Sequence, residues 1–433
     1  MRMREYCVLT QRVTRILNII GRWYGMARIH TKRSLYFLLI LLFFLTACVS
    51  EPAKEKEESL PTKKLPEDIA GDHEVEENKN TDSIRDLIDS MSLEEKAGQV
   101  IMPAFRHDYE GEAILTVSDE LKDILEQMKP GGVILFSENI ADEQQVIKLI
   151  NDLQSTADIP LFIAVDEEGG SVSRLTGKGI EFPVLPGNRV LGGIGDTDKV
   201  YDSGKLLGKH LAELGFNMNM APVADVDSNP ENPVIGDRSF GSDPKMVARM
   251  ALAQADGMME EGIIPVFKHF PGHGDTDQDT HYQQVTLMHP EERMKSVELF
   301  PFQKGINKGI PAIMTAHLMV PLYDDTYPAT LSEKIITDLL RGKMGFEGLV
   351  ITDALEMQAI ASEWHSSEAA VKALKAGTNL LLMPTEPVKT HEAIVEAVKK
   401  DILPEQKLDE SVKIILELKK QYNLTSGPLQ YHE

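Results

Sequence analysis

Residues 263–267 read Ile-Ile-Pro-Val-Phe, an apolar run with the composition of a buried strand. The chain continues directly into residues 268–281, Lys-His-Phe-Pro-Gly-His-Gly-Asp-Thr-Asp-Gln-Asp-Thr-His, and no apolar periodicity returns before about Pro290. Structureless segments of this length inside compact domains are usually functional or disordered. Glycine and proline at its start favour a shaped loop. The sequence therefore predicts that a buried strand ends at Phe267 and delivers an active-site loop, residues 271–290.

Seven other apolar segments of strand length accompany this strand. The eight segments are residues 100–105, 132–136, 161–165, 217–223, 263–267, 312–315, 349–351 and 379–383. Helical periodicity separates them, as where Leu121, Ile124, Leu125 and Met128 share one helix face. Eight short strands alternating with helices predict an α/β fold, a single (β/α)8 TIM-type barrel. A doubly wound open sheet is the alternative fold.

Polar residues follow four of these strands at the point where each one ends. Asp166, Lys268, His317 and Asp353 come after the third, fifth, sixth and seventh strands. The carboxyl ends of barrel strands converge on one face, where active sites lie. One such residue is ordinarily a loop residue in water, but four together predict a shared site.

Three residues have the chemistry of a catalytic group. Asp353 stands between apolar neighbours, where a carboxylate can act as a nucleophile or an electrostatic stabiliser, or can cap the following helix. Asp279 and His281 are two residues apart, and a carboxylate in that position can orient an imidazole for proton transfer. An ordinary pair of surface side chains is the alternative interpretation of Asp279 and His281.

Loop 271–290 and the strand end before it also have a composition that suits a transition metal. The candidate ligands are His269, His273, Asp275, Asp277, Asp279 and His281. Their spacing fits no standard ligand pattern, and Lys268 would repel a cation. We therefore expect no metal and no cofactor.

The N-terminal region has the pattern of an export signal. Residues 1–33 hold eight bases and one acid, and residues 35–47 form an apolar run that ends in Leu-Thr-Ala before Cys48. The run is shorter than the roughly 20 residues of a spanning helix, although an uncleaved anchor is the alternative. The ending resembles a bacterial lipoprotein signal, in which the cysteine is lipidated. Met26 is a second plausible start, which would make residues 1–25 an upstream extension.

This pattern divides the chain into a signal peptide, residues 1–47, a lipidated tether, residues 48–81, a barrel, residues 82–424, and a tail, residues 425–433. The tether is rich in Glu, Lys and Pro, a composition typical of disorder. We expect an extracytoplasmic monomer that is anchored to a bacterial membrane through Cys48, with no second domain. Without residues 1–47 the chain carries 37 bases and 67 acids, a balance that disfavours nucleic acid as a partner.

Four segments carry a resemblance to a known family. They are Asp166-Glu167-Glu168-Gly169-Gly170, Gly236-Asp237-Arg238-Ser239-Phe240, the run from Lys268 to His281, and Ile351-Thr352-Asp353-Ala354. Together they resemble glycoside hydrolase family 3 and, more narrowly, its bacterial β-N-acetylglucosaminidase branch. The resemblance covers about residues 82–423, and the run from Lys268 to His281 is its most specific part.

The resemblance implies a role for each matching residue. Asp353 corresponds to the nucleophile, and Asp279 and His281 correspond to a dyad in which His281 is the general acid and then the general base. The implied contacts to the terminal sugar are Asp166, Arg174, Arg238, Lys268, His269 and, with a poorer local match, Arg106. His317 is expected to line the same site without a definite role.

The implied reaction is retaining hydrolysis of a terminal β-linked N-acetylglucosamine. The substrate would be a cell-wall muropeptide or a chitin-type oligosaccharide. Phosphorolysis is one alternative, because a neutral histidine repels phosphate less than a carboxylate does. A lipid-tethered sugar-binding protein without catalysis is the other.

Overall fold

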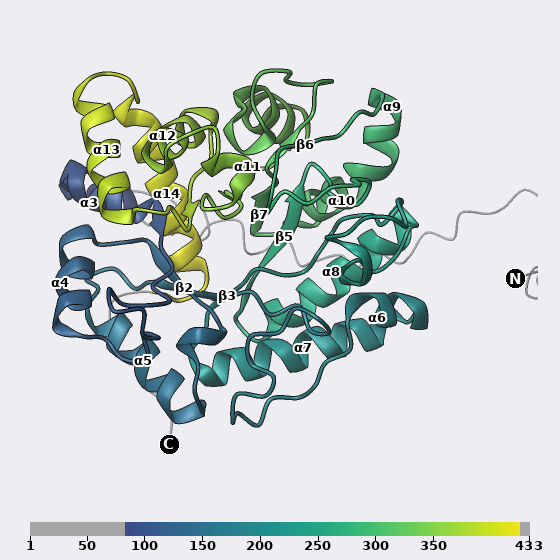
Figure 1. The fold of residues 1–433 in the computed structure, drawn as a ribbon, viewed down its shortest axis with the longest axis horizontal. Helices are drawn as coiled ribbons and strands as arrows, with labels where there is room; N and C mark the ends of the chain where they lie inside the picture. Colours follow the sequence, from purple (N-terminus) through teal and green to yellow (C-terminus); the bar gives the residue numbers. More distant parts are fainter. Residues whose placement is uncertain (1–82, 425–433) are drawn as a thin grey trace, which may run out of the picture. The chain divides into compact units, whose positions relative to one another are not determined.

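The computed structural model describes residues 83–424 (Figure 1). The predicted signal peptide, the lipidation at Cys48, the tether and the tail all lie outside these residues, as does residue 82 at the start of the predicted barrel. Within residues 83–424, no helix has both the length and the apolar character needed to cross a membrane.

Eight parallel strands form the centre of the fold. They are β1 (Ile101–Met102), β2 (Gly132–Leu135), β3 (Phe162–Val165), β4 (Met218–Asn219), β5 (Ile264–Phe270), β7 (Ala312–Thr315), β9 (Leu349–Ile351) and β10 (Leu381–Leu382). Six of them pair in the order β2-β3-β4-β5-β7-β9, and β1 pairs with β10.

Backbone contacts join these two sheets into a ring. Leu380, next to β10, bridges in parallel to Ile351 of β9. On the other side, the N–H groups of Gly131 and Ile134 donate to the carbonyls of Ile101 and Pro103, at 3.0 and 3.1 Å. The predicted (β/α)8 barrel is therefore confirmed, and the open doubly wound sheet is excluded.

Helices surround the strands (Figure 1). The α-helices with assigned bounds are α3 (Leu93–Gln99), α4 (Asp119–Met128), α5 (Glu143–Ser155), α6 (Asn188–Ile194), α7 (Thr197–Leu214), α8 (Pro244–Glu260), α9 (Glu291–Arg293), α10 (Phe300–Lys308), α11 (Gln358–Ala361), α12 (Ser366–Ala376), α13 (Pro387–Lys399) and α14 (Glu405–Gln421). Residues 83–90 are also helical. Two π-helical segments, η3 (Met294–Glu298) and η5 (Lys334–Lys343), and a small sheet of β6 (Val285–Thr286) and β8 (Leu318–Met319) complete the outer layer, with short 3-10 turns between elements.

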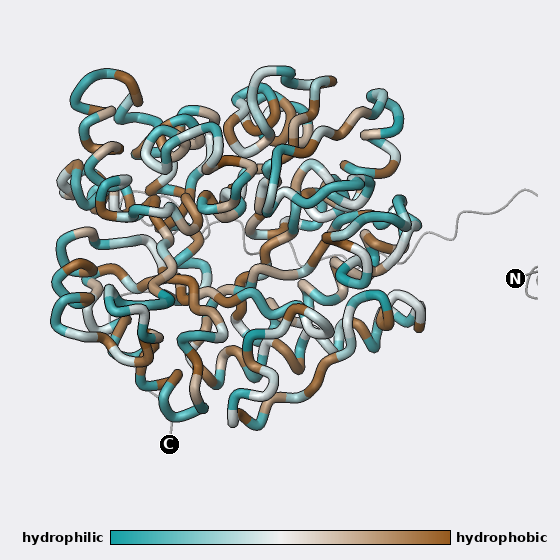
Figure 2. Tube along the Cα trace, viewed as in Figure 1, coloured by the Kyte–Doolittle hydropathy of each residue, from teal (hydrophilic) through white to brown (hydrophobic). Residues whose placement is uncertain are grey.

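Local sequence sets these helix limits. A capping box begins α3, because Ser92 Oγ accepts the Glu95 N–H at 3.1 Å and Glu95 Oε2 accepts the Ser92 N–H at 2.8 Å. In α4 the apolar face predicted from periodicity is largely buried, and Lys129 ends the helix in a left-handed conformation. Figure 2 shows hydrophobic residues concentrated on the strands and on the helix faces that cover them.

The first and last parts of the described chain are joined at one side of the barrel. Lys96 of α3 forms an ion pair with Asp409 of α14 at 2.7 Å. Lys419, also on α14, donates to Gln99 Oε1 at 3.0 Å from a fully buried position. Together with the β1–β10 pair, these contacts fix the seam at which the ring of strands closes.

The strands differ from the prediction in their limits: β1, β4 and β10 are shorter than the predicted segments 100–105, 217–223 and 379–383, whereas β5 is extended at its carboxyl end. The strand β5 continues to Phe270, so Lys268 and His269 lie within it rather than in the loop that follows. A backbone bridge between Val223 and Lys268 and the pairing of Phe270 with Thr315 extend the ladder. The polar side chains tolerate this position because buried carboxylates accept hydrogen bonds from them, as described below.

Candidate active site

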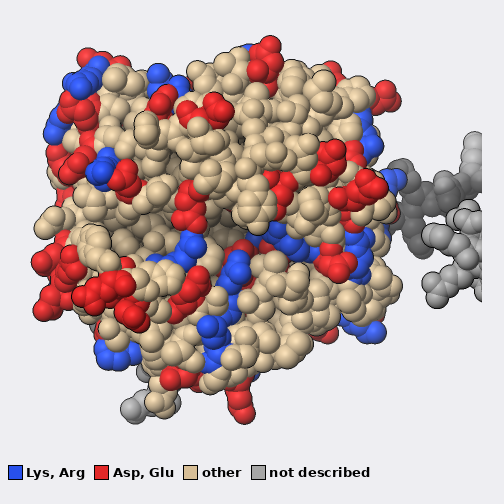
Figure 3. Space-filling model, in the orientation of Figure 1, with Lys and Arg blue, Asp and Glu red and all other residues tan. Residues whose placement is uncertain are grey.

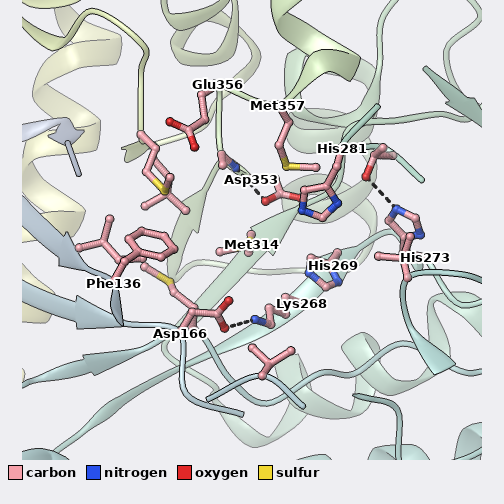
Figure 4. A pocket seen from close by; sticks show the side chains of 18 of the residues that line it. Phe136, Asp166, Lys268, His269, His273, His281, Met314, Asp353, Glu356 and Met357 are labelled. Atoms are coloured by element: carbon pink, nitrogen blue, oxygen red, sulfur yellow. Dashed lines mark hydrogen bonds and ion pairs between the residues drawn. The ribbon is translucent and has the colours of Figure 1, made fainter. Parts of the chain in front are cut away.

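A cavity of about 340 Å³ opens at the carboxyl ends of the strands (Figure 4). The predicted site residues that line it are Arg106, Asp166, Arg174, Arg238, Lys268, His269, His281 and Asp353. Asp279 lies directly behind His281. The structure thus brings together residues that are up to about 250 positions apart in the sequence.

Charged side chains form one wall of this cavity, with the buried Glu168 behind them. We refer to Asp166, Glu168, Arg174, Arg238 and Lys268 as the binding network. Glu168 accepts hydrogen bonds from Arg238 Nε and Nη2, at 2.9 and 2.7 Å, and lies 2.6 Å from Lys268 Nζ. Lys268 also donates to Asp166 at 2.6 Å (Figure 4), and Arg174 donates to Asp166 at 3.1 Å.

The charge of Glu168 is stabilised by its neighbours. Burial alone would raise the pKa of Glu168, but the adjacent Arg238 and Lys268 outweigh burial and hold the pKa well below its usual value. An alternating set of fixed anions and cations offers both hydrogen-bond acceptors and donors, which suits a ligand rich in hydroxyl groups.

Asp225 holds His269 in place. Its Oδ2 lies 2.7 Å from His269 Nδ1, and its Oδ1 accepts the His273 N–H at 2.7 Å. With Nδ1 bound to a carboxylate, His269 turns Nε2 toward Arg238 Nη2, at 3.4 Å, and toward the cavity. The peptide bond between Lys268 and His269 is cis.

Asp353 follows β9 and reaches the cavity from a partly buried position (Figure 4). Its Oδ1 accepts the Ala354 N–H at 2.8 Å. Burial alone would raise the pKa of Asp353, but the imidazoles of His317 and His269 and this N–H outweigh burial and hold the pKa below its usual value. Helix α11 begins only at Gln358, with Met357 at its N-cap, so Asp353 does not cap it.

The prediction that His317 lines the site is wrong. His317 is fully buried and is absent from the cavity lining. Its Nε2 donates to the Ala354 carbonyl at 2.9 Å, and its Nδ1 lies 2.8 Å from Thr330 Oγ1. Burial lowers the pKa of His317. Both ring nitrogens bond to protein atoms, so the ring supports the backbone next to Asp353 rather than contacting a ligand.

Asp279 and His281 form the predicted pair. Asp279 Oδ1 accepts the His281 N–H at 2.8 Å and lies 2.6 Å from His281 Nδ1. The His281 side chain is 54% exposed. Because Asp279 occupies Nδ1, Nε2 is the nitrogen left to exchange protons, and Figure 4 shows the His281 ring beside Asp353 at the cavity.

A few contacts attach this pair to the barrel. Thr280 Oγ1 lies 3.1 Å from His273 Nε2 (Figure 4), and the Thr280 carbonyl accepts the Ala359 N–H at 3.2 Å. Burial and the neighbouring His269 lower the pKa of His273 to about 4, so this ring is neutral near pH 7. Gly272 shapes the start of the loop, since its φ is +123° and a Cβ there would lie 2.8 Å from Glu298 Cβ.

The six candidate metal ligands do not converge. Within residues 83–424, the group close enough to share an ion is Asp275, His289 and Glu298, and it includes one of the six. Arg293 already supplies positive charge there, donating to Glu298 Oε1 at 3.0 Å and to Asp275 Oδ2 at 3.3 Å. The contact between Arg293 and Asp275 ties the first part of loop 271–290 to the helical segment that follows it.

The sequence interpretation missed several residues of the site. Asp225 comes two residues after the predicted strand 217–223, so the strand-end argument could have found it. Glu168 belongs to the segment from Asp166 to Gly170, but the family resemblance implies no role for it. Glu356 forms an ion pair with Arg106 from 250 positions away, and the guanidinium of Arg106 lies 4.6 Å from the centre of the Phe136 ring. No local pattern indicates either contact.

The rest of the cavity lining is largely apolar. It includes the side chains of Ile134, Phe136, Met220, Met314, Met357, Leu382 and Met383. The cavity therefore offers a ligand a charged wall and an apolar wall.

Comparison with known proteins identifies similar sequences and a matching family. Residues 92–418 match the glycosyl hydrolase family 3 N terminal domain. The chain is 34% identical over 381 residues to beta-hexosaminidase A of Pseudoalteromonas piscicida, covering 78% of this chain and 63% of the relative. It is 35% identical to a beta-hexosaminidase of Nitrosomonas eutropha, covering 61% of this chain and 76% of the relative.

A solved structure agrees with these matches. The family 3 beta-N-acetylglucosaminidase from Paenibacillus superimposes with a TM-score of 0.75 at 38% identity, covering 79% of this chain and 65% of that protein. This chain thus spans less than two thirds of the length of two of these three relatives. The matched domain, the barrel and the strand-end residues agree, and the chain belongs to glycoside hydrolase family 3.

Proposed function

We propose that this protein is a retaining exo-glycosidase that releases terminal β-linked N-acetylglucosamine. One observation carries the proposal. A carboxylate whose low pKa keeps it ionised, Asp353, lies at the same cavity as an imidazole, His281, that Asp279 orients. Relatives named beta-hexosaminidase and beta-N-acetylglucosaminidase support the sugar. The binding network would hold the hydroxyls of that sugar, and the apolar wall of the cavity would contact the acetamide methyl.

The first step forms a covalent intermediate. Asp353 Oδ attacks the anomeric carbon, and the bond from that carbon to the glycosidic oxygen breaks. Protonated His281 gives its Nε2 proton to the departing oxygen, so the aglycone leaves as a neutral alcohol. Asp279 keeps the ring oriented and balances its positive charge before transfer.

The second step restores the enzyme. Neutral His281 removes a proton from water, and the water oxygen attacks the anomeric carbon and displaces Asp353. The products are the free sugar in its β-configuration, the Asp353 carboxylate and protonated His281. Both steps use the same histidine, which must therefore remain accessible to solvent between them.

Trapping tests the nucleophile. A fluorinated N-acetylglucosamine donor that slows the second step should add one sugar mass to the peptide containing Asp353. Asp353→Asn should remain unlabelled, and thermal unfolding of that variant checks that it is folded. A label on another residue, or an active enzyme that gives no label, contradicts the assignment.

Phosphorolysis is the second candidate, because the acid/base group is an imidazole and not a carboxylate. Phosphate could then replace water in the second step and yield the sugar 1-phosphate. Product analysis in phosphate and in phosphate-free buffer separates the two reactions. Equal turnover in both, with free sugar as the product, assigns hydrolysis.

We further propose that the enzyme acts outside the cytoplasm, lipidated at Cys48. The apolar run and the Leu-Thr-Ala-Cys ending support this location. Expression of the full chain in a bacterial host with a labelled fatty acid should label the protein in the membrane fraction. Cys48→Ser should abolish the label. Labelling that persists in the variant contradicts the proposal.

A further inference from the structure

A second cavity adjoins the active site. It has a volume of about 450 Å³ and lies between residues 104–124, which run from the end of β1 into α4, and residues 383–389, which run from β10 into α13. We name it the outer groove. It shares Glu356 and Met383 with the active-site cavity, so the two cavities meet at these side chains.

The surface of the groove suits a sugar chain. Apolar side chains line it, including Phe105, Leu121 and Val388. Tyr109, in the loop between β1 and α4, also lines the groove and is 85% exposed. Sugar rings have apolar C–H faces and hydroxyl edges. An exposed tyrosine offers a flat apolar face for stacking, and the carboxylates around the groove accept hydrogen bonds from hydroxyls.

The charges of the groove are predominantly negative. Four acids line it, Asp108, Glu120, Glu356 and Glu386, against the single cation Lys389. Lys389 is already paired with Glu386, and Arg106 pairs with Glu356. Within residues 83–424, no cation forms an ion pair with either Asp108 or Glu120. Figure 3 shows acidic side chains gathered over the α4 side of this face, while basic side chains lie nearer its centre.

Resting on the proposed function, we propose that the outer groove binds the aglycone and that its preferred aglycone is an uncharged β-linked chain of N-acetylglucosamine. Muramyl peptides carry carboxylates, which the unpaired acids repel. Like charges a few ångströms apart interact appreciably even near a protein surface. The groove therefore selects chitin-type over cell-wall substrates, a choice that the active-site cavity alone does not make.

Stacking is tested with Tyr109→Ala on two substrates. A nitrophenyl N-acetylglucosaminide reports the active-site cavity alone, and chitotriose reports both cavities. We expect kcat/KM for chitotriose to fall about threefold to tenfold, the usual worth of an aromatic contact, with the nitrophenyl substrate nearly unchanged. Val184→Ala is the matched control, because Val184 is 82% exposed and lines neither cavity.

Charge is tested with the double variant Glu120→Gln/Glu386→Gln. It removes two groove carboxylates and releases Lys389, so kcat/KM for a muramyl peptide carrying terminal N-acetylglucosamine should rise about tenfold. The value for chitotriose should change less than twofold, because each glutamine keeps an amide oxygen that accepts a hydrogen bond from a sugar hydroxyl. Glu126→Gln/Glu392→Gln is the control, because it removes the same charge from α4 and α13 outside the groove and should leave both substrates unchanged.

The outcomes separate the two proposals. A wild-type enzyme inactive on the nitrophenyl substrate contradicts the proposed function itself. An enzyme active on that substrate overturns only the groove inference in either of two cases. In the first, Tyr109→Ala leaves chitotriose turnover unchanged. In the second, the wild type prefers the muramyl peptide and the charge variant does not raise its turnover above that of the control.

Discussion

The binding network and loop 271–290 face the same cavity but are built in opposite ways. In the network, Glu168 and Lys268 are each 2% exposed and fixed by several short ionic contacts. In the loop, His281 is half exposed, and its attachment to the barrel relies on a few hydrogen bonds. A sugar is held by donors and acceptors that do not move, whereas a proton is exchanged by a group that water can reach. Stability and turnover should therefore depend on different regions.

The largest effect should come from His281→Ala. Removing the acid/base group should lower turnover of an unactivated disaccharide about 10² to 10⁴-fold, while the melting temperature stays within about 1 °C because the side chain is exposed. A nitrophenyl substrate, whose leaving group needs less protonation, should lose much less in the bond-breaking step. Steady-state kinetics on both substrates and thermal unfolding measure this.

Asp279→Asn refines the same test. Amide and carboxylate have the same shape, so the loop should stay in place while the support of the protonated imidazole is lost. Turnover should fall, but by less than in His281→Ala. Equal activity of Asp279→Asn and wild type would show that His281 acts without a partner.

The next largest effect should be on stability. Glu168→Gln leaves Lys268 and Arg238 buried with fewer anions, which should lower the free energy of unfolding by about 3 to 5 kcal/mol. Urea unfolding measures the change, with Asp237→Asn as a control at an exposed acid. A loss below about 1 kcal/mol would mean that the network is not the stabilising region.

The pH dependence of the free energy of unfolding should report on His273 in loop 271–290. Its folded pKa of about 4 lies below its unfolded value near 6.5, so the unfolded chain binds more protons between these values. The stability from His273 is complete above about pH 6.5 and decreases as pH falls toward 4. Between pH 7 and 5 the wild type should lose about 2 kcal/mol more than His273→Gln. Parallel stability curves for the two proteins would contradict this.

The smallest effect should come from Thr280→Val, which keeps the shape but removes the hydrogen bond to His273. One such bond is worth about 0.5 to 1.5 kcal/mol, so kcat should fall about threefold to tenfold as the dyad spends less time in position. KM for the nitrophenyl substrate should change less than twofold. A change in KM alone would show that Thr280 supports binding rather than the acid/base step.

The sequence predicts the barrel well because buried parallel strands are continuous apolar runs and helices have their own period. It also locates Asp166, Lys268 and Asp353, because strand ends share one face of a barrel. It does not show that β5 continues through Lys268 and His269. Polar residues after an apolar run indicate the end of a strand, and the sequence does not reveal that Glu168 and Asp225 form ion pairs and hydrogen bonds with these two side chains. The sequence also does not predict the outer groove or the Arg106–Glu356 pair, because each of them joins loops that are distant in sequence.

The seam between α3 and α14 has a consequence for how the chain folds. The first strand, β1, finds its partner β10 about 280 residues later, so the ring cannot close until nearly the whole domain has been synthesised. Contacts of such sequence separation make folding slow. A chain cut before β10 would leave β1 and β9 as exposed edges, which pair readily with other chains. We therefore expect chains that end before β10 to aggregate rather than to yield a smaller working enzyme.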